Sequence, residues 1–325
     1  MRLIKQSYEI WQQPSGLEGI YKQIERVGRV CYKSEDKITE DSAKSFVDRM
    51  IKSGHGAMLE HGTVYLQVPN SNDICLVLAL NPYTKYKSIG DTCYATTNLR
   101  VLVEHDALWL MKYQCEPTEF HEKRICVKFI CDRGILAEFT RHRTFSFSAE
   151  STRYCNYSKD KFNNELTFIK PCWLDIPTGQ YVYWDGDWCN IDKMRIQLPE
   201  GEHKDIDAFL WTLNNAETHY TLLINSGWKP QEARAVLPNS LKTELVMTGF
   251  VDDWWGEYLV IDKSTGLIDQ RIHGKFYTEP NNIDTEKYRI VEKGFFPLRC
   301  NKGAHPQAQE LAVPLRETFI NQKIW

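Results

Sequence analysis

Polar and apolar residues in the middle of the chain follow first the period of a strand and then that of a helix. Residues 125–129 alternate between apolar and polar side chains, which is typical of a half-buried strand. Residues 135–139 then place apolar side chains at helical spacing. If this helix continues, Glu138, Arg141 and His142 lie three and four residues apart and share one face. The pattern therefore predicts a strand followed by a core helix with polar residues at its far end.

The same periods predict most of the remaining elements. They indicate helices at about residues 41–53, 206–224 and 311–320, and short strands at 63–68 and 166–169. Gly54 follows the first of these helices and can end it in a left-handed conformation. Residues 259–261 and 267–268 flank the turn residues Ser264-Thr265-Gly266, which indicates a hairpin. Since no internal repeat or low-complexity linker occurs, we expect one α+β domain over residues 1–325.

Composition and charge narrow the class of protein. With 325 residues, 42% of them hydrophobic and 26% charged, the chain can bury a sizeable core. The formal net charge of -3 argues against a general binder of nucleic acid or of membrane surfaces. No apolar run approaches the roughly 20 residues of a membrane span, and the first residues do not open a signal peptide. We therefore expect a cytoplasmic protein with neither nucleic-acid nor membrane partners.

The sequence contains neither a recognisable metal-binding motif nor a complete dinucleotide-binding turn. The ten cysteines are scattered, and neither Cys-x-x-Cys nor His-Glu-x-x-His occurs, so we expect reduced thiols and no metal. Gly54-His55-Gly56 begins like a dinucleotide-binding turn. However, Leu59 stands where the third glycine would be, and no strand is evident before it.

A short basic segment follows the predicted core helix. It reads Arg141-His142-Arg143-Thr144-Phe145-Ser146-Phe147-Ser148-Ala149-Glu150-Ser151-Thr152-Arg153-Tyr154. Each arginine presents five donors on a planar, permanently charged fork, which suits phosphate or carboxylate. The segment therefore favours an anion-binding site, with a solvated surface segment as the alternative.

The spacing of this segment resembles the signature of the flavin-dependent thymidylate synthases, the ThyX family. Arg-His-Arg is followed by seven residues, a serine and Thr-Arg-Tyr. Further blocks resemble family segments in the same order, at residues 52–61, 233–238, 295–299 and 308–311. The resemblance implies a ThyX-like mixed sheet with flanking helices, interrupted by two family-atypical insertions at about 70–115 and 257–294.

The resemblance implies which residues contact the substrate dUMP. Arg299 would polarise the pyrimidine ring and is the predicted catalytic residue, whereas a surface ion pair to a glutamate such as Glu310 is the alternative. Arg153 and Arg234 would hold the nucleotide phosphate. The implied substrate-binding set is Glu138, Arg141, Glu150, Ser151, Thr152, Arg153, Arg234 and Arg299.

The resemblance also implies a flavin site that adjacent subunits share. The implied cofactor-binding set is His55, Ala57, Arg141, His142, Arg143 and Glu150. Without the resemblance, His55 would be interpreted as a helix cap or a packing residue. The pattern Gly-His-x-x-x-x-Glu-His around it favours the cofactor.

The activity implied is the reductive methylation of dUMP to dTMP by a homo-oligomer, which the resemblance implies is a tetramer. Methylene-tetrahydrofolate would be the carbon donor, FAD the redox carrier and NADPH the reductant. One alternative is a phage-type flavin-dependent pyrimidine-nucleotide hydroxymethylase or methylase. Another is a catalytically inactive nucleotide-binding regulator.

Several positions depart from the family pattern. Ala149 stands where glutamate is common, Glu138 where glutamine is common and Ala57 where a hydroxyl residue is common. Residues 250–253 replace a stretch that usually offers asparagine and arginine to the flavin. Cys155 is predicted to be a bystander, because the implied mechanism uses no enzyme thiol. Asp252-Asp253 is predicted to be a loop or a helix cap rather than a magnesium pair.

Overall fold

The computed structural model describes residues 1–71, 77–78, 81–159, 162–193, 204–276 and 283–325. The helices that bear on the site are α1 (Gly16–Tyr32), α2 (Ser42–Lys52), α3 (Gly56–Leu59), α5 (Leu99–Glu104), α6 (Arg133–Phe139), α7 (Lys204–Asn225), α8 (Pro230–Ala233), α9 (Val251–Trp255), α10 (Phe295–Cys300) and α11 (Pro306–Asn321). Short 3-10 helices are η1 (Glu35–Lys37), η2 (Leu108–Tyr113), η4 (Ile191–Lys193), η5 (Arg234–Val236) and η6 (Gly274–Phe276). The strands are β1 (Arg2–Ile4), β2 (Ser7–Trp11), β3 (Thr63–Pro69), β4 (Lys85–Ile89), β5 (Thr92–Asn98), β6 (Arg124–Asp132), β7 (Ser146–Ala149), β8 (Thr167–Ile169), β9 (Gly179–Trp184), β10 (Asp187–Asn190), β11 (Lys242–Phe250), β12 (Glu257–Asp262), β13 (Ile268–His273) and β14 (Tyr288–Lys293). The α+β class expected from the sequence is confirmed.

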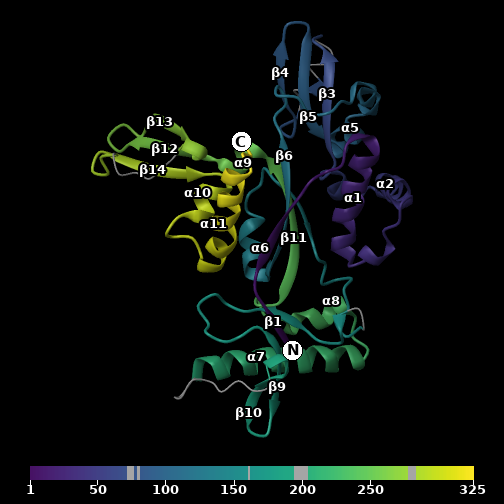
Figure 1. Cartoon of the computed structure of the whole chain (residues 1–325), viewed down its shortest axis with the longest axis vertical. Helices are drawn as coiled ribbons and strands as arrows, with labels where there is room; N and C mark the ends of the chain where they lie inside the picture. The colour runs from purple at the N-terminus through teal and green to yellow at the C-terminus, as the bar shows by residue number, and fades with distance from the viewer. Residues whose placement is uncertain (72–76, 79–80, 160–161, 194–203, 277–282) are drawn as a thin grey trace.

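A four-stranded antiparallel sheet in the order β2-β6-β11-β7 forms the centre of the molecule (Figure 1). Successive side chains of β6 point to opposite faces of this sheet. On one face, Val127 and Phe129 are buried in a core shared with the helices α10 and α11. The opposite face carries Cys126 and Val246 and packs against α1. The sheet therefore separates α10 and α11 from α1 and holds both.

Helices α1 and α2 lie beside a three-stranded sheet in the order β3-β5-β4 (Figure 1). The prediction of a helix at 41–53 and a strand at 63–68 is confirmed by α2 and β3. Gly54 follows α2 with a φ of 71°, in the left-handed region expected of it. Helix α1 was not predicted, although its residues Ile20, Ile24 and Val27 recur at helical spacing and are buried.

A second four-stranded sheet, β10-β9-β1-β8, packs with α7 around a separate core (Figure 1). The hairpin between β9 and β10 turns at Asp185 and Gly186, and both have positive φ angles, of 52° and 83°. Such a pair fits the two-residue turns that join twisted strands. The strand predicted at 166–169 and the helix predicted at 206–224 are β8 and α7.

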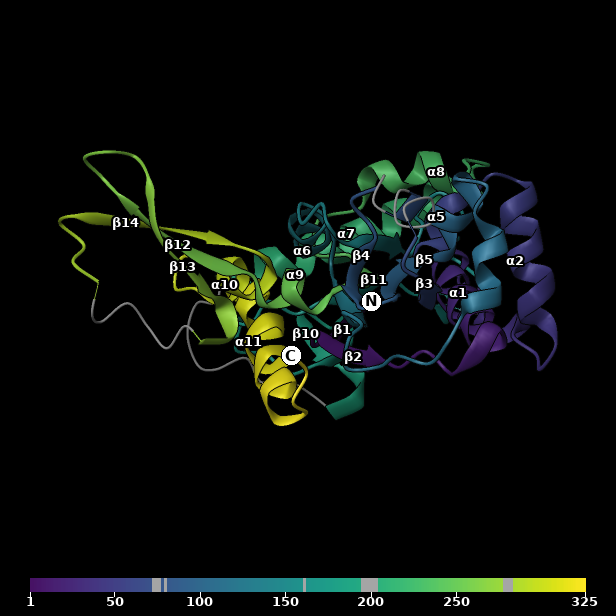
Figure 2. The same ribbon diagram turned by 90° about the horizontal axis from the view of Figure 1, so that it is seen from above.

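The strands β13-β12-β14 form a small sheet that projects away from α1 and α2 (Figure 2). It lies within residues 257–294, and it contains the hairpin expected there between β12 and β13. The C-terminal helix expected at 311–320 is part of α11. That residues 70–115 and 257–294 are insertions relative to the family stays a prediction.

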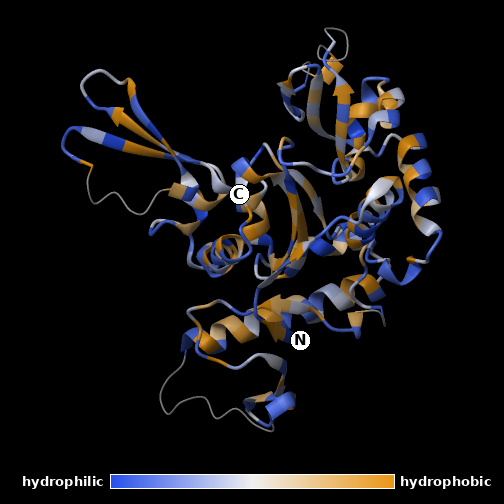
Figure 3. Cartoon of the chain, turned by 45° about the horizontal axis from the view of Figure 1, so that its top comes forward, coloured by the Kyte–Doolittle hydropathy of each residue, from blue (hydrophilic) through white to orange (hydrophobic). Residues whose placement is uncertain are grey.

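Apolar residues gather on the central strands, whereas the helices carry apolar and polar residues in turn (Figure 3). This distribution fits amphipathic helices that cover a sheet. Among the described residues, no helix combines the length and the apolar character that crossing a membrane requires.

Candidate active site

Arg299, Glu138 and His142 form one polar cluster where α10 meets the end of α6. Arg299 Nη1 donates to Glu138 Oε2 at 2.7 Å, and Nη2 donates to the carbonyl oxygen of Glu138 at 2.7 Å. Arg299 Nε donates to His142 Nε2 at 2.9 Å. Glu310, the glutamate considered as an alternative partner, instead accepts a hydrogen bond from Gln6. The structure thus brings three predicted site residues together.

The imidazole of His142 is neutral in this cluster. Burial and the neighbouring charge of Arg299 lower the pKa of His142 to about 4. At neutral pH its Nε2 can therefore accept the hydrogen bond from Arg299. The charge of the cluster is carried by Arg299 and Glu138 alone.

Aromatic packing places Arg299. Phe295 begins α10 and is fully buried, with its ring centroid 4.9 Å from that of Phe139 and 5.2 Å from that of His142. Arg299 lies four residues later, on the same side of the helix. The buried ring therefore directs the guanidinium group toward the end of α6.

The expectation that Glu138, Arg141 and His142 share one helical face is wrong. Helix α6 ends at Phe139, and the backbone amides of Arg141 and His142 bond to carbonyl groups three residues back. This tighter turn rotates the chain, so that His142 is buried while Arg141 is exposed. His142 therefore faces the protein interior, and Arg141 faces solvent.

Strand β7 carries the motif along the edge of the central sheet. It pairs with β11, and Phe145 just before it packs on Gly249, where a Cβ atom would lie 2.5 Å from the ring. The amide of Glu150 continues the pairing by donating to the carbonyl oxygen of Glu244 at 2.8 Å. The position of the residues after Glu150 is therefore tied to β11.

Glu150 is buried, and side chains of the protein contact both of its carboxylate oxygens. Its Oε1 accepts from the hydroxyl of Tyr157 at 2.9 Å, and its Oε2 lies 2.7 Å from Lys242 Nζ. Burial and the charge of Glu150 raise the pKa of Tyr157, which keeps its hydroxyl protonated as a donor. Both carboxylate oxygens thus have partners in the protein, and direct contact of Glu150 with substrate or cofactor stays a prediction.

The phosphate-binding residues predicted after Glu150 lie close to Arg234. Arg234 Nη1 donates to Thr152 Oγ1 at 3.1 Å. Ser151 Oγ accepts from the amide of Arg153 at 3.3 Å. Arg153 and Arg234 are both exposed. The structure therefore joins residues of the motif to a residue more than eighty positions later in the chain.

His55 and Ala57 lie at the start of α3, and both are exposed. His55 Nδ1 is 3.4 Å from the hydroxyl of Tyr32, whose ring centroid is 5.3 Å from that of Tyr154. Through Tyr32, His55 is thus linked to the residue that follows Arg153. Sequence reasoning missed Tyr32, because nothing in its local pattern separates it from an ordinary helix residue.

The three arginines of the motif and Arg234 have no acidic partner among the described residues. Within the described part of the chain, no carboxylate lies within 4.0 Å of the guanidinium groups of Arg141, Arg143, Arg153 and Arg234. All four are exposed, although the chain carries more acidic than basic residues. An exposed guanidinium group without an acid can take a phosphate with little rearrangement.

A cavity of about 980 Å³ lies behind the motif. Tyr32, Lys33, Glu150, Tyr157 and Lys242 are among the residues that line it. None of the four exposed arginines does, so this cavity and the exposed arginines are different features. Tyr157, Lys242 and Lys33 were not predicted as site residues, because their roles depend on contacts across the fold.

Three further residues singled out in the sequence, Cys155, Asp252 and Asp253, have structural positions. Cys155 is fully buried in the core around α7. Asp252 and Asp253 lie in the first turn of α9, where acidic side chains interact favourably with the helix dipole.

Comparison with known proteins identifies the family. A family model described as thymidylate synthase complementing protein matches residues 92–256, just over half of the chain. The chain belongs to this family. The membership confirms the ThyX resemblance of the motif, which lies inside the matched residues, whereas His55 and Arg299 lie outside them.

One curated relative is the flavin-dependent thymidylate synthase of Haloarcula marismortui, which is 28% identical over 117 residues. These residues are 36% of this chain and 45% of the relative, so the ThyX-family chain spans about half the length of the curated relative that it matches.

Two solved structures of the UMP/dUMP methylase PolB from Streptomyces cacaoi align with this ThyX-family chain. The structure bound with 5-Br UMP gives a TM-score of 0.37 at 12% identity and covers 99% of this chain and 92% of that chain. The structure bound with 5-Br dUMP gives a TM-score of 0.30 at 15% identity and covers 78% and 76%.

Proposed function

We propose that this protein is a flavin-dependent thymidylate synthase that converts dUMP to dTMP. Methylene-tetrahydrofolate is the carbon donor, FAD the redox carrier and NADPH the reductant in this proposal, and the cytoplasm is the location. The observation that carries it is that Arg141, Arg143 and Arg153 of the motif, together with Arg234, are exposed and have no acidic partner among the described residues, in a chain of this family. Such a set suits ligands that bring several phosphates.

Arg153 and Arg234 hold the phosphate of dUMP. The bond from Arg234 to Thr152 supports this, because it brings the Arg234 guanidinium group to the residue next to Arg153, and Ser151 adds a hydroxyl there. A bidentate guanidinium group matches the geometry of a phosphate, and each charge-assisted contact contributes about 1.5 to 3 kcal/mol.

Arg141 and Arg143 hold the pyrophosphate of FAD, together with the exposed His55 and Ala57. The two exposed guanidinium groups flank His142 and fit an anionic group. When bound, the flavin supplies the reducing equivalent of the reaction. His142, which is buried and neutral, orients Arg299 in this proposal rather than contacting phosphate directly.

Arg299 stabilises the negative charge that develops on the pyrimidine ring. Its planar fork can contact N3 and a neighbouring carbonyl oxygen together. Glu138 and His142 already hold three of its donors and fix the orientation of the fork. To bind the pyrimidine, Arg299 exchanges part of its contact with the Glu138 carboxylate, which is 36% exposed, for the ring.

The site is shared between copies of the chain in a homotetramer. Arg299 contacts Glu138 and His142, whereas Arg234 contacts Thr152 and His55 contacts Tyr32. A second copy can bring the two groups together. Co-expression of Arg299→Ala and Arg153→Ala chains tests this, because mixed oligomers regain part of the activity only if each site combines two chains.

A pyrimidine-nucleotide hydroxymethylase is the second candidate. The sequence at Ala149, where glutamate is common in the family, favours it, with the buried Glu150 as the next residue after β7. The inactive regulator differs from both enzymes in binding the nucleotide without turnover.

Flavin binding and dUMP-dependent oxidation test the proposal. The purified protein is titrated with FAD, followed by absorbance, and NADPH oxidation is then measured with and without dUMP. We expect a bound flavin, weaker FAD binding in Arg143→Ala and oxidation coupled to dUMP. A wild-type protein that takes up no flavin contradicts the proposal and favours the regulator.

A further inference from the structure

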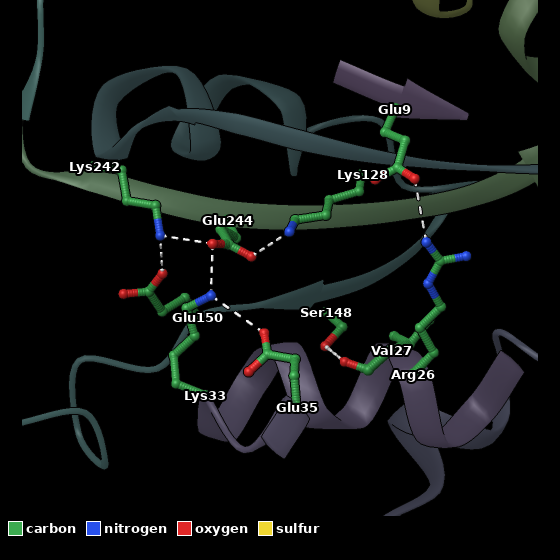
Figure 4. Close-up of polar contacts among 10 residues, drawn as sticks. All are labelled: Glu9, Arg26, Val27, Lys33, Glu35, Lys128, Ser148, Glu150, Lys242 and Glu244. Carbon is green, nitrogen blue, oxygen red and sulfur yellow. Dashed lines mark hydrogen bonds and ion pairs between the residues drawn. The ribbon is translucent and has the colours of Figure 1, made fainter. Parts of the chain in front are cut away.

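Glu244 is a buried carboxylate that three lysines share (Figure 4). Its Oε1 lies 2.6 Å from Lys33 Nζ and 2.7 Å from Lys242 Nζ. Its Oε2 lies 2.7 Å from Lys128 Nζ. The exposed fractions of the three lysine side chains are only 15% to 19%, so the contacts are shielded from water.

The three lysines come from different parts of the fold. Lys128 lies on β6 and Lys242 begins β11, so these two belong to neighbouring strands of the central sheet. Lys33 instead follows α1 as its C-cap. It has a φ of 47°, which a residue with a Cβ atom adopts at a cost. Its contact with Glu244 therefore ties the end of α1 to the sheet.

Lys242 links Glu244 to the segment that carries Arg153. Lys242 Nζ lies 2.7 Å from both Glu244 and the buried carboxylate of Glu150. The residue after Glu150 is Ser151, whose amide donates to the carbonyl oxygen of Cys31 at 3.0 Å. The segment with Arg153 and the end of α1 are therefore in direct contact.

Lys33 links Glu244 to the segment that carries His55. Its neighbour Tyr32 contacts His55 through its hydroxyl and Tyr154 through its ring. Lys33 also contacts Glu35 at 3.2 Å, but the side chain of Glu35 is 41% exposed, whereas that of Glu244 is 7% exposed. Of these two carboxylates, that of Glu244 is the buried one.

Glu244 supplies one of the two buried negative charges that offset the three lysines. Burial alone would raise the pKa of Glu244, but Lys242, Lys33 and Lys128 together hold it below its ordinary value. Without this carboxylate, three buried lysines would face the single buried carboxylate of Glu150. The lysines would then repel one another.

We propose that Glu244 is a positioning residue whose carboxylate, by holding Lys33 and Lys242, fixes the segment of Tyr32 and the segment of Glu150 to Arg153 relative to each other. The consequence for ligands rests on the function proposed above. The consequence for the free protein does not, since it concerns contacts within one chain.

Lys33→Met and Lys128→Met form a matched pair of variants. Each removes one lysine contact with Glu244, and the two lysines are buried to a similar extent. Only Lys33 leads to the Tyr32 segment. Glu244→Gln is less suitable as the first variant, because it leaves all three lysines without their shared partner and can prevent folding.

Hydrogen exchange of the free protein is the direct test. The amide of Ser151 crosses between the two segments, and those of Tyr154 and Cys155 follow it in the same turn. We expect Lys33→Met to speed exchange at these amides about tenfold relative to Lys128→Met at equal global stability. Equal exchange in the two variants overturns the proposal, because Glu244 would then only stabilise the fold.

Ligand binding is the second arm of the test. We expect Lys33→Met to raise the Kd for dUMP about tenfold, and Lys128→Met to change it much less. If the wild type binds dUMP and both variants bind it equally well, the positioning role is contradicted. If the wild type binds no dUMP, the proposed function fails, and the hydrogen-exchange result still decides the positioning role.

Discussion

Arg299 Nε donates a hydrogen bond to His142 Nε2 at 2.9 Å, although 157 residues separate the two in the sequence. This bond joins the residue predicted to activate the pyrimidine to the histidine of the motif. It requires a neutral imidazole with its proton on Nδ1. Arg299 is therefore oriented before any ligand binds, which is the condition for effective electrostatic stabilisation of a developing charge.

Arg299→Lys is expected to lower turnover by a factor on the order of ten to a hundred while FAD binding changes little. Lysine keeps the charge but loses the planar fork, so one charge-assisted contact worth about 1.5 to 3 kcal/mol disappears in the activated complex. Steady-state turnover and FAD titration of the same preparation measure the two effects. A variant that loses FAD binding as strongly as turnover would show that Arg299 acts on the cofactor.

Arg153→Ala is expected to act mainly on nucleotide affinity. In the proposed site the variant would lose a phosphate contact that is formed in the ground state and in the transition state alike, so we expect the dUMP dissociation constant to rise by about tenfold or more. Direct dUMP binding and turnover at saturating dUMP separate the two quantities. Equal, small effects of Arg153→Ala and Arg299→Lys would mean that other arginines carry these roles.

The stability of the protein is expected to fall as the pH decreases from about 6.5 to about 4 because of His142. The pKa of His142 is lowered to about 4 in the folded chain, against roughly 6.5 in the unfolded chain, so the unfolded state binds the proton first. This contributes up to about 3 kcal/mol, which is present above pH 6.5 and lost by pH 4.

His142→Gln isolates that contribution, because glutamine does not titrate and can still accept a hydrogen bond from Arg299. Urea unfolding of both proteins from pH 7 to pH 4 should show the wild type losing its advantage over this range. His61, whose pKa is also lowered by burial, titrates in both proteins and cancels. A difference that does not change with pH would argue against a buried neutral His142.

Cys155→Ala is expected to keep most of the activity. The sulfur is fully buried in the core around α7 and cannot reach a nucleotide without local unfolding. The substitution should cost about 1 kcal/mol of stability through lost packing, measured by thermal unfolding. A covalent complex with 5-fluoro-dUMP mapped to Cys155 would overturn this prediction.

The sequence was sufficient where local chemistry decides the outcome. The motif from Arg141 to Tyr154 and the strand β6 before it both follow from short-range patterns. The sequence predicts that α6 continues to His142, because the 3.6-residue period does not break after Phe139. In the structure, Arg141 and His142 instead form a tighter turn.

Contacts between distant segments could not be predicted. Glu138 rather than Glu310 pairs with Arg299, since the approach of α10 to α6 depends on the packing of Phe295 on Phe139. Glu244 follows Lys242 and Thr243 at the polar start of β11, and nothing in this local pattern distinguishes it. Its contact with Lys33 depends on the fold, which brings these distant residues together.

Formation of dTMP tests the central claim most directly. The protein is incubated with dUMP, FAD, NADPH and methylene-tetrahydrofolate labelled with carbon-13 at the methylene group, and the nucleotide product is analysed by mass spectrometry. We predict dTMP with one labelled carbon, formed only when FAD is present. A labelled hydroxymethyl nucleotide would instead identify the second candidate function, and unchanged dUMP with a flavin-loaded protein would contradict the assignment as an enzyme of thymidylate synthesis.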